Sequence, residues 1–195
     1  VDRDLAHRQQ GYGRGGRMKI ETDQITFTGG VRDGATLGSP IAFSIENRDH
    51  KNWLEKMAAA PLPAPPEALT RPRPGHADLA GGQKYDRHDL RDILERASAR
   101  ETASRVAVGA IAKKLLAAAG IDVFAHVLSI GDVACSSSAL ASLSHAEIKE
   151  KARASDLACA DVDAEAKMKE AIKAASHAGD TLGGIFEVVA TGVMP

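Results

Sequence analysis

The chain has few aromatic residues, little net charge and no long apolar run, and each shortage excludes a class of protein. Aromatic residues make up 4% of the 195 positions, so the stacking platforms that single-stranded nucleic-acid binders use are scarce. The formal net charge is −1 at pH 7, which leaves no global field to attract nucleic acid or an anionic membrane. The sequence shows no signal peptide and no apolar segment long enough to span a bilayer. We therefore expect no nucleic-acid partner and no membrane partner.

Cysteine is scarce as well. The two cysteines, Cys135 and Cys159, stand far apart in the sequence and lack the spacing of a metal site. We expect no metal, and the low cysteine content favours a reduced, cytoplasmic compartment. The sequence allows a disulfide between the two but gives no support for one.

Arginine is distributed unevenly along the chain. Of the 14 arginines, 13 lie at or before Arg105, and the second half of the chain uses lysine instead. Arginine is preferred for forked contacts with phosphate and carboxylate, whereas lysine suits solvated surface. The part of the chain up to Arg105 is therefore predicted to hold an anion-binding site, and the remainder to serve as scaffold.

The strongest candidate for that site is a proline-rich loop that precedes the longest helical pattern. Arg71 and Arg73 each stand before a proline, which keeps them in an extended conformation. Gly75 lets the chain turn beside His76. A histidine next to two stiffly held arginines, directly ahead of a charged helix, indicates an anion site. The alternative is a proline-rich connector with solvated arginines.

One long helix is predicted over residues 89–119. Asp86 or Asp89 caps its start, and Gly120 ends it. Apolar residues recur at helical spacing, at Leu90, Ile93, Leu94, Ala97, Val108, Ile111, Ala112 and Leu115. The second half of the helix is apolar on almost every side, so we expect it to be buried within a larger body.

Charged residues fall on this helix where a packed helix normally carries apolar ones. At about 100° per residue, Glu101 and Ser104 fall within the apolar stripe, while Arg96 and Arg100 lie one turn apart on its edge. A carboxylate on a buried face needs a partner, and like charges one turn apart repel unless an anion lies between them. Chemistry alone leaves two interpretations open: an internal Arg–Glu network, or a site for phosphate or carboxylate.

The other segments predict an α+β protein. Residues 1–10 are predicted to be helical, and the loop Gly11–Arg17 that follows contains the spacing G-x-G-x-x-G. A dinucleotide-binding fingerprint needs that spacing between a strand and a helix, whereas here it stands between a helix and a strand, so we reject that interpretation. Further strands are expected as short antiparallel ones over 18–45 and as longer ones over 121–130 and 185–193. Further helices are expected from Ser144 and over 161–178, with a loop of small residues over 135–142 before them. Strands on both sides of the central helix are consistent with a layered α+β fold.

Five sequence blocks together carry a family resemblance. They are Gly11–Met18 (GYGRGGRM), Thr36–Ile41 (TLGSPI), Arg71–Asp78 (RPRPGHAD), Arg96–Thr102 (RASARET) and Gly179–Gly184 (GDTLGG). In this order and at this spacing they resemble the chorismate synthase family over nearly the whole chain. The resemblance implies a β-α-β sandwich, with helices packed between antiparallel sheets, and a homotetramer.

The same resemblance implies a reaction. Members of the family are lyases that convert 5-enolpyruvylshikimate 3-phosphate to chorismate and phosphate by 1,4-elimination, the last step of the shikimate pathway in aromatic amino acid biosynthesis. They need reduced FMN, and bifunctional members use NADPH to reduce it. The small-molecule substrate carries a phosphate and two carboxylates, which fits the arginine bias. Two alternatives are an arginine-rich nucleotide or nucleic-acid binding module and an inactive interaction fragment.

The resemblance also assigns roles to individual residues. His76 matches an active-site histidine thought to act as an acid toward the reduced flavin, which suits a side chain that titrates near neutral pH. Arg8 and Arg14 match positions that contact phosphate-bearing ligands, namely NADP in bifunctional members, and that lie close to the substrate. The segment that matches an FMN contact consists of Arg96, Ala97 and Ser98. Further candidate anion contacts are Arg17, Arg48, Arg71, Arg73 and Arg100.

Residues 1–195 are interpreted as the central part of a single domain of this family. The expected subdivision is a Gly/Arg loop and β-hairpin region over 1–57, a proline-rich active-site loop over 58–88, the central helix over 89–119, and a strand-helix-helix-strand scaffold over 120–195. The family's first active-site histidine and its later flavin-binding residues lie outside these positions. The chain by itself is therefore expected to be inactive.

Overall fold

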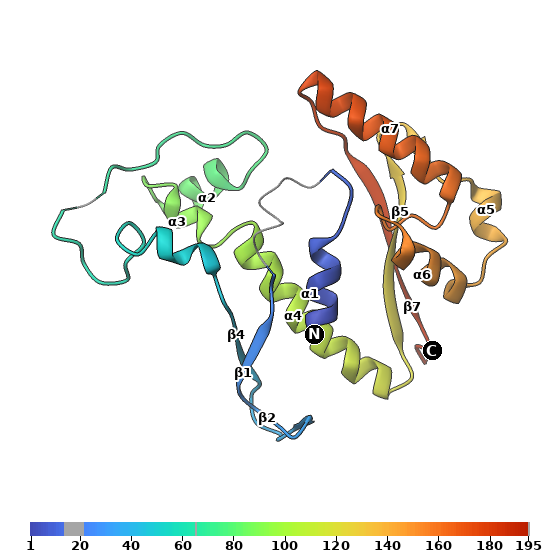
Figure 1. The fold of residues 1–195 in the computed structure, drawn as a ribbon, viewed down its shortest axis with the longest axis horizontal. Helices are drawn as coiled ribbons and strands as arrows, with labels where there is room; N and C mark the ends of the chain where they lie inside the picture. Colours follow the sequence, from blue (N-terminus) through green and yellow to red (C-terminus); the bar gives the residue numbers. More distant parts are fainter. Residues whose placement is uncertain (14–21, 65, 195) are drawn as a thin grey trace. The chain divides into compact units, whose positions relative to one another are not determined.

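The structure is a computed structural model that describes residues 1–13, 22–64 and 66–194 (Figure 1). The chain forms two compact units: Val1–Arg8 with Lys19–Ala110, and Gln9–Met18 with Ile111–Pro195. Every strand pair in the described part of the chain is antiparallel, and helices lie between the strands in sequence. The predicted α+β class is therefore confirmed.

The first unit begins with a helix and two antiparallel strand pairs. These elements are α1 (Asp2–Gln9), β1 (Ile25–Gly29), β2 (Val31–Arg32), β3 (Ala35–Thr36) and β4 (Ala42–Ile45), with β1 paired to β4 and β2 to β3. A short 3-10 helix, η2 (Arg48–Asn52), follows. The helix over 1–10 and the antiparallel strands were both expected, because local apolar alternation and glycine turns specify them.

Two glycines with positive φ shape these strand pairs. The first is Gly34 (φ 73°), which forms the two-residue turn between β2 and β3 together with Asp33 (φ 50°). Both residues have the conformation that fits the twist of a hairpin. Gly30 (φ 81°) lies where a Cβ atom would collide with the carbonyl oxygen of Pro40, whereas a Cβ atom on Gly34 would meet nothing within 4 Å.

This difference predicts unequal costs for two matched substitutions. Gly34→Ala should lower the free energy of unfolding by about 1 kcal/mol, the cost of a left-handed alanine. Gly30→Ala should cost about 2 kcal/mol or more, because the backbone must also move away from the added methyl group. Urea unfolding of both variants measures this, and equal costs would show that the contact with Pro40 is not tight.

The predicted helix over 89–119 is divided in two, which corrects the sequence interpretation. The structure has α3 (Arg91–Leu94) and α4 (Ala99–Ala118). Between them, the N–H groups of Arg96 and Ala97 bond to carbonyls three residues back, and Ser98 takes a φ of 58°. An α-helix ends when its last N–H groups bond to carbonyls three rather than four residues back and the next residue is left-handed. The helix that begins at Arg91 therefore ends before Ser98, and α4 is a separate helix.

The proline-rich segment over 58–88 also differs from the prediction, since it contains a helix, α2 (Asp78–Tyr85). An acidic residue at a helix start is stabilised by the helix dipole, and Asp78 occupies that position. The left-handed residue Asp86 (φ 51°) ends the helix. The loop that carries Arg71, Arg73 and His76 is therefore shorter than expected.

The core of the first unit forms where small residues of α4 meet α1 and the strands. Leu5 of α1 is fully buried against Ala103 and Ala107, with Ile25, Phe43 and Ile45 packed around them. The predicted apolar stripe is only partly right, because Val108 is 56% exposed and Leu115 is 74% exposed. The second half of the helix, which was expected to be buried within a larger body, is exposed at these two positions in this chain.

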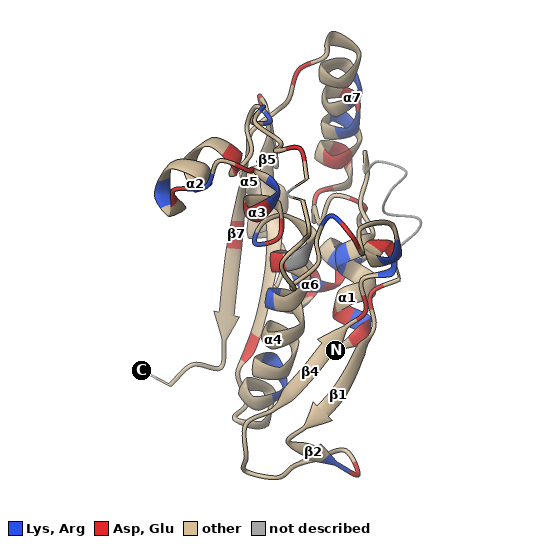
Figure 2. Cartoon of the chain, turned by 90° about the vertical axis from the view of Figure 1, so that its left-hand side faces the viewer, with Lys and Arg blue, Asp and Glu red and all other residues tan. Residues whose placement is uncertain are grey.

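The second unit is a three-stranded antiparallel sheet with helices against it. Its elements are β5 (Asp122–Ile130), β6 (Val133–Ala134), α5 (Ser137–Ala141), α6 (His145–Ala154), α7 (Val162–Ala178) and β7 (Gly184–Thr191), with strand order β6-β5-β7. Two buried clusters, centred on Ile148 of α6 and Met168 of α7, pack these helices against β5. Figure 2 shows that β7 is almost free of charge, with Glu187 as its single acidic residue.

The helix signals in this unit were read correctly with one exception. Ser144 and Glu147 form the predicted capping box, and α7 runs from an Asp161 cap to Gly179 (φ 71°). The loop of small residues predicted over 135–142 contains α5, because serine and alanine tolerate helix as well as loop. Within the described part of the chain, no helix has the length and hydropathy needed to cross a membrane.

Candidate functional site

The first site residue, Arg8, is held in place by two partners from distant parts of the first unit. Its Nη1 atom donates to Oδ2 of Asp23 at 3.1 Å, and its Nη2 atom donates to Oγ1 of Thr102 at 2.7 Å. The side chains of Arg8 and Asp23 are only 14% and 8% exposed. Thr102 lies 94 positions from Arg8 in the sequence, in the first turn of α4, so the fold places this guanidinium beside the start of that helix.

The start of α4 combines an unusual backbone conformation with helix-end chemistry. Thr102 donates both its N–H and its hydroxyl to the carbonyl of Ser98, each at 3.0 Å. The first N–H groups of a helix have no partners within it and attract anions. A non-glycine residue with positive φ, such as Ser98, stores strain that often marks a functional position. Ser98 and Arg96 are exposed, while Ala97 between them is buried.

Arg96 is oriented by an aromatic side chain. Its Cζ atom lies 4.0 Å from the centroid of the Tyr85 ring, and its Nη2 atom donates to the Tyr85 hydroxyl at 3.2 Å. Stacking on an aromatic face leaves the other donors of the guanidinium free to bind an anion. An open pocket of about 320 Å³ lies beside this pair, lined by Tyr85, Arg87, Asp92, Ile93, Glu95 and Arg96.

Arg73 has its donors occupied by a buried carboxylate. Its Nε atom donates to Oδ2 of Asp78 at 2.9 Å, its Nη2 atom to Oδ1 at 3.0 Å, and its backbone N to Oδ2 at 2.9 Å. These bonds from Arg73 hold the pKa of the fully buried Asp78 carboxyl at about 2, below its usual 3.8. Arg73 thus fixes the loop in this structure, and its fork is not free for a ligand.

The Arg73–Asp78 pair frames His76. The backbone N of His76 donates to the carbonyl of Arg73 at 3.3 Å, and Gly75 before it has a φ of 69°. The imidazole is exposed. A tied-down backbone with an accessible ring suits a group that gives or takes a proton.

Acid is expected to weaken the fold as Asp78 becomes protonated. Its folded pKa of about 2 lies below the usual 3.8, so the stability that ionised Asp78 contributes is complete above about pH 4 and is lost as the pH falls toward 2. Urea unfolding across this range measures it, with Asp78→Asn for comparison. The gap in unfolding free energy between the two proteins should shrink toward pH 2, and a gap independent of pH would contradict this account.

The remaining candidates are less well defined. Arg48 and Arg71 are exposed, and neither has a salt-bridge partner in the described part of the chain. Arg14 and Arg17 lie outside the described residues, as does the side chain of Arg100.

The expected burial of Glu101 is wrong. Its Oε1 atom lies 2.6 Å from Nε of Arg105, in an i,i+4 pair whose side chains are 45% and 77% exposed. The Arg–Glu contact that one interpretation foresaw therefore exists, but at the surface rather than inside.

Sequence reasoning missed three residues that hold the predicted arginines: Asp23, Asp78 and Tyr85. Asp78 could have been found, since an acid five positions after Arg73 and at a helix start is a natural partner. No sequence signal pairs Asp23 with Arg8, or Tyr85 with Arg96, because both contacts depend on how the chain folds back on itself.

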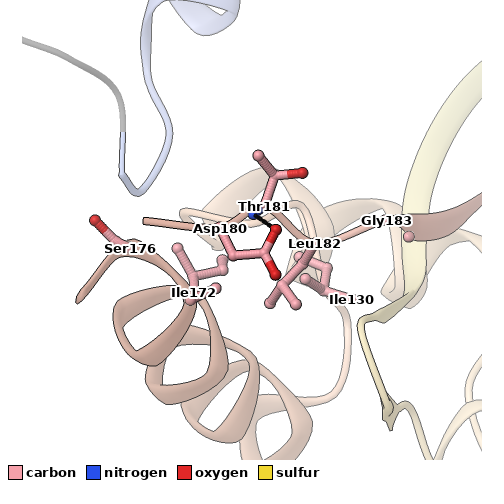
Figure 3. Close-up of a pocket in the computed structure, with 9 residues that line it drawn as sticks. Ile130, Ile172, Ser176, Asp180, Thr181, Leu182 and Gly183 are labelled. Carbon is pink, nitrogen blue, oxygen red and sulfur yellow. Dashed lines mark hydrogen bonds between the residues drawn. The ribbon is translucent and has the colours of Figure 1, made fainter. Parts of the chain in front are cut away.

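A larger pocket lies in the second unit, where Gly179–Gly184 turns the chain from α7 into β7. It measures about 470 Å³ and is lined by Ile130, Ile172, Ala175, Ser176, Asp180, Thr181, Leu182, Gly183 and Gly184. Figure 3 shows Asp180, whose Oδ1 atom accepts from the backbone N of Thr181 at 2.7 Å, beside the side chains of Ile172 and Leu182. The pocket is formed by a sequence block that carried the family resemblance, although no role was predicted for it.

Across the described residues, no group of three or more His, Cys, Asp or Glu side chains could hold a metal ion.

Comparison with known proteins gives one consistent result. The sequence model of the family described as "Chorismate synthase" matches residues 1–195. The chain is 55% identical over 195 residues to the chorismate synthase of Rubrobacter xylanophilus, covering 100% of this chain and 49% of that protein. It is 56% identical over 201 residues to the chorismate synthase of Symbiobacterium thermophilum, covering 100% of this chain and 51% of that protein.

A solved structure gives the same picture at the level of fold. The chain is similar to a crystal structure of chorismate synthase with a TM-score of 0.73 and 37% sequence identity, covering 100% of this chain and 49% of that one. The chain thus spans about half the length of the curated relatives it matches.

Proposed function

The chain belongs to the chorismate synthase family, and on this premise we propose that the full-length protein containing it is a chorismate synthase. This lyase converts 5-enolpyruvylshikimate 3-phosphate to chorismate and phosphate with reduced FMN. By full-length protein we mean one of the relatives' length, since this chain spans about half of it.

The observation that carries the proposal is the contact between Arg8 and Thr102. Arg8 was predicted to contact a phosphate-bearing ligand, and the segment ending at Ser98 was predicted to contact FMN. These positions are far apart in the sequence, yet the 2.7 Å bond from Arg8 to Thr102 joins Arg8 to the turn that Ser98 begins. This bond supports a common ligand site at the start of α4 for the two positions to which the resemblance assigns ligand contacts.

The donors at this helix start fit the phosphate of FMN. Arg96 and Ser98 are exposed next to the first N–H groups of α4, which is the chemistry that binds phosphates. When bound, reduced FMN supplies the electronic step of the elimination. The chain's own part is to hold the flavin through Arg96, Ala97 and Ser98, and to hold the phosphate-bearing substrate through Arg8. His76 acts as an acid that gives a proton to the reduced flavin.

We infer further properties of the full-length protein from the family. It is a cytoplasmic homotetramer, and residues 1–195 belong to a single domain of it. If the protein also reduces its own flavin, NADPH is the reductant. The 195-residue chain alone is inactive, because it supplies only part of the flavin site.

An anaerobic assay tests the proposal. Chorismate formation from 5-enolpyruvylshikimate 3-phosphate is followed with chemically reduced FMN, beside a control without flavin and a sample of the 195-residue chain. Flavin-dependent product from the full-length protein alone is expected. No product from a folded, flavin-binding full-length protein would overturn the function, and product from the shorter chain would overturn its inactivity.

A further inference from the structure

The two cysteines lie side by side in the core of the second unit. Cys135 directly follows β6 and Cys159 stands shortly before α7, and their Sγ atoms are 3.4 Å apart. A disulfide requires about 2.05 Å between these atoms, so the two sulfur atoms must approach each other by about 1.4 Å to form the bond. Cys159 is 2% exposed, whereas Cys135 is only partly buried.

One hydrogen bond joins the two backbone segments around the pair, and another fixes the segment that carries Cys159. The backbone N of Ser136 donates to Oδ2 of Asp161 at 2.9 Å, which joins the residue after Cys135 to a residue close to Cys159. The backbone N of Cys159 donates to Oγ of Ser155 at 2.9 Å. Because these bonds exist before any sulfur–sulfur bond forms, closing the disulfide orders little additional chain.

We propose that Cys135 and Cys159 form an oxidation site, at which a small-molecule disulfide converts the thiol pair into a reversible intramolecular disulfide. The site lies within the second unit, and the proposal does not depend on the function inferred above. Its substrate class is a symmetrical low-molecular-weight disulfide, and a small thiol reverses the reaction.

The reaction proceeds by two exchanges. The Cys135 thiolate attacks one sulfur of the small disulfide, forming a mixed disulfide and releasing one small thiolate. Cys159 then attacks the Cys135 sulfur and releases the second small thiolate. The two thiolates take up the two protons lost by the cysteines, so the protein loses two electrons and two protons while one small disulfide becomes two small thiols.

The surroundings set the order and the pace of these steps. Only Cys135 is accessible enough to meet the small disulfide, so it is the attacking thiol and the buried Cys159 is the resolving one. Burial, together with the hydrogen bond to Cys159 and the charge of Asp161, raises the pKa of the Cys135 thiol. The first step is therefore slow at neutral pH, because little thiolate is present.

The test uses the folded chain with bis(2-hydroxyethyl) disulfide as the probe. Peptide mapping without reductant should show Cys135 and Cys159 in one cross-linked pair of peptides, and the intact mass should fall by two hydrogens. The rate should keep rising about tenfold per pH unit beyond about pH 9, where an ordinary thiol is already largely ionised. The oxidised protein should melt at a temperature higher by about 5 °C or more.

Two single variants distinguish the roles of the cysteines. Cys159→Ala should stop at a mixed disulfide on Cys135, and Cys135→Ala should remain unmodified while folded. Cross-links between molecules, equal adducts in both variants, or a cross-link that forms only in urea would overturn the proposal. A lower melting temperature after oxidation would show that the thiols are not pre-positioned, and would overturn it equally.

Discussion

Replacing His76 by alanine in the full-length protein is expected to lower the turnover number by on the order of 10²-fold, the usual contribution of a general acid. The exposed imidazole is the only part that the substitution removes. The ion pair between Arg73 and Asp78 and the turn at Gly75 remain, so the loop keeps its course. Flavin affinity should stay within about twofold of the unchanged protein, because His76 acts in the chemical step rather than in binding.

The measurement is the anaerobic turnover number with reduced FMN, alongside a flavin titration. His177→Ala is the matched control, since His177 is also exposed but lies on α7 in the second unit. The control should turn over normally. Unchanged turnover in the His76 variant would remove the acid role, and a parallel loss of flavin affinity would make His76 a binding residue instead.

The parts of the fold that were predicted correctly are those fixed by short-range chemistry. The Ser144 capping box and the glycine at 179 depend on residues within one helical turn, and both helix ends are where the sequence places them. The strand pairs of the first unit likewise follow from local alternation and from the turn at Asp33 and Gly34. Such signals survive folding because tertiary contacts reinforce them.

The break before α4 could not be predicted from local signals. Residues 95–102 are mostly good helix formers, and nothing in their propensities ends a helix at Ser98. The break also resets the helical phase, which explains the error at Glu101. Glu101 was assigned to a buried face by extending the pattern of Leu90 and Ile93 across the break, and it lies at the surface instead.

Candidate site residues were named where a motif marks them, whereas the residues that hold them in place were not. His76, Arg8 and Arg96 were named from sequence, whereas Asp23 and Tyr85 were not, because a pairing over many positions leaves no periodic signal. The proximity of Cys135 and Cys159 belongs to the same class, since it results from α7 packing beside β6.

Removing the carboxylate of Asp23 is expected to lower the free energy of unfolding by about 3 kcal/mol. Among the described residues, the Asp23→Ala variant leaves the guanidinium of Arg8, only 14% exposed, with Thr102 as its remaining side-chain partner. Breaking a buried ion pair costs about this much. Asp92→Ala is the matched control, because its pair with Arg87 spans 3.6 Å and both side chains are at least half exposed. That control should cost less than about 0.5 kcal/mol.

A double variant separates stability from ligand binding. In Arg8→Met/Asp23→Leu, both ions are replaced by apolar groups of similar size, so the unfolding free energy should return to within about 1 kcal/mol of the original value. Affinity of the full-length protein for 5-enolpyruvylshikimate 3-phosphate should nevertheless fall about tenfold or more, since a charged donor to the phosphate is lost. Urea unfolding and a binding titration measure the two quantities. Recovered stability with unchanged affinity would leave Arg8 as a structural residue and would remove it from the proposed substrate site.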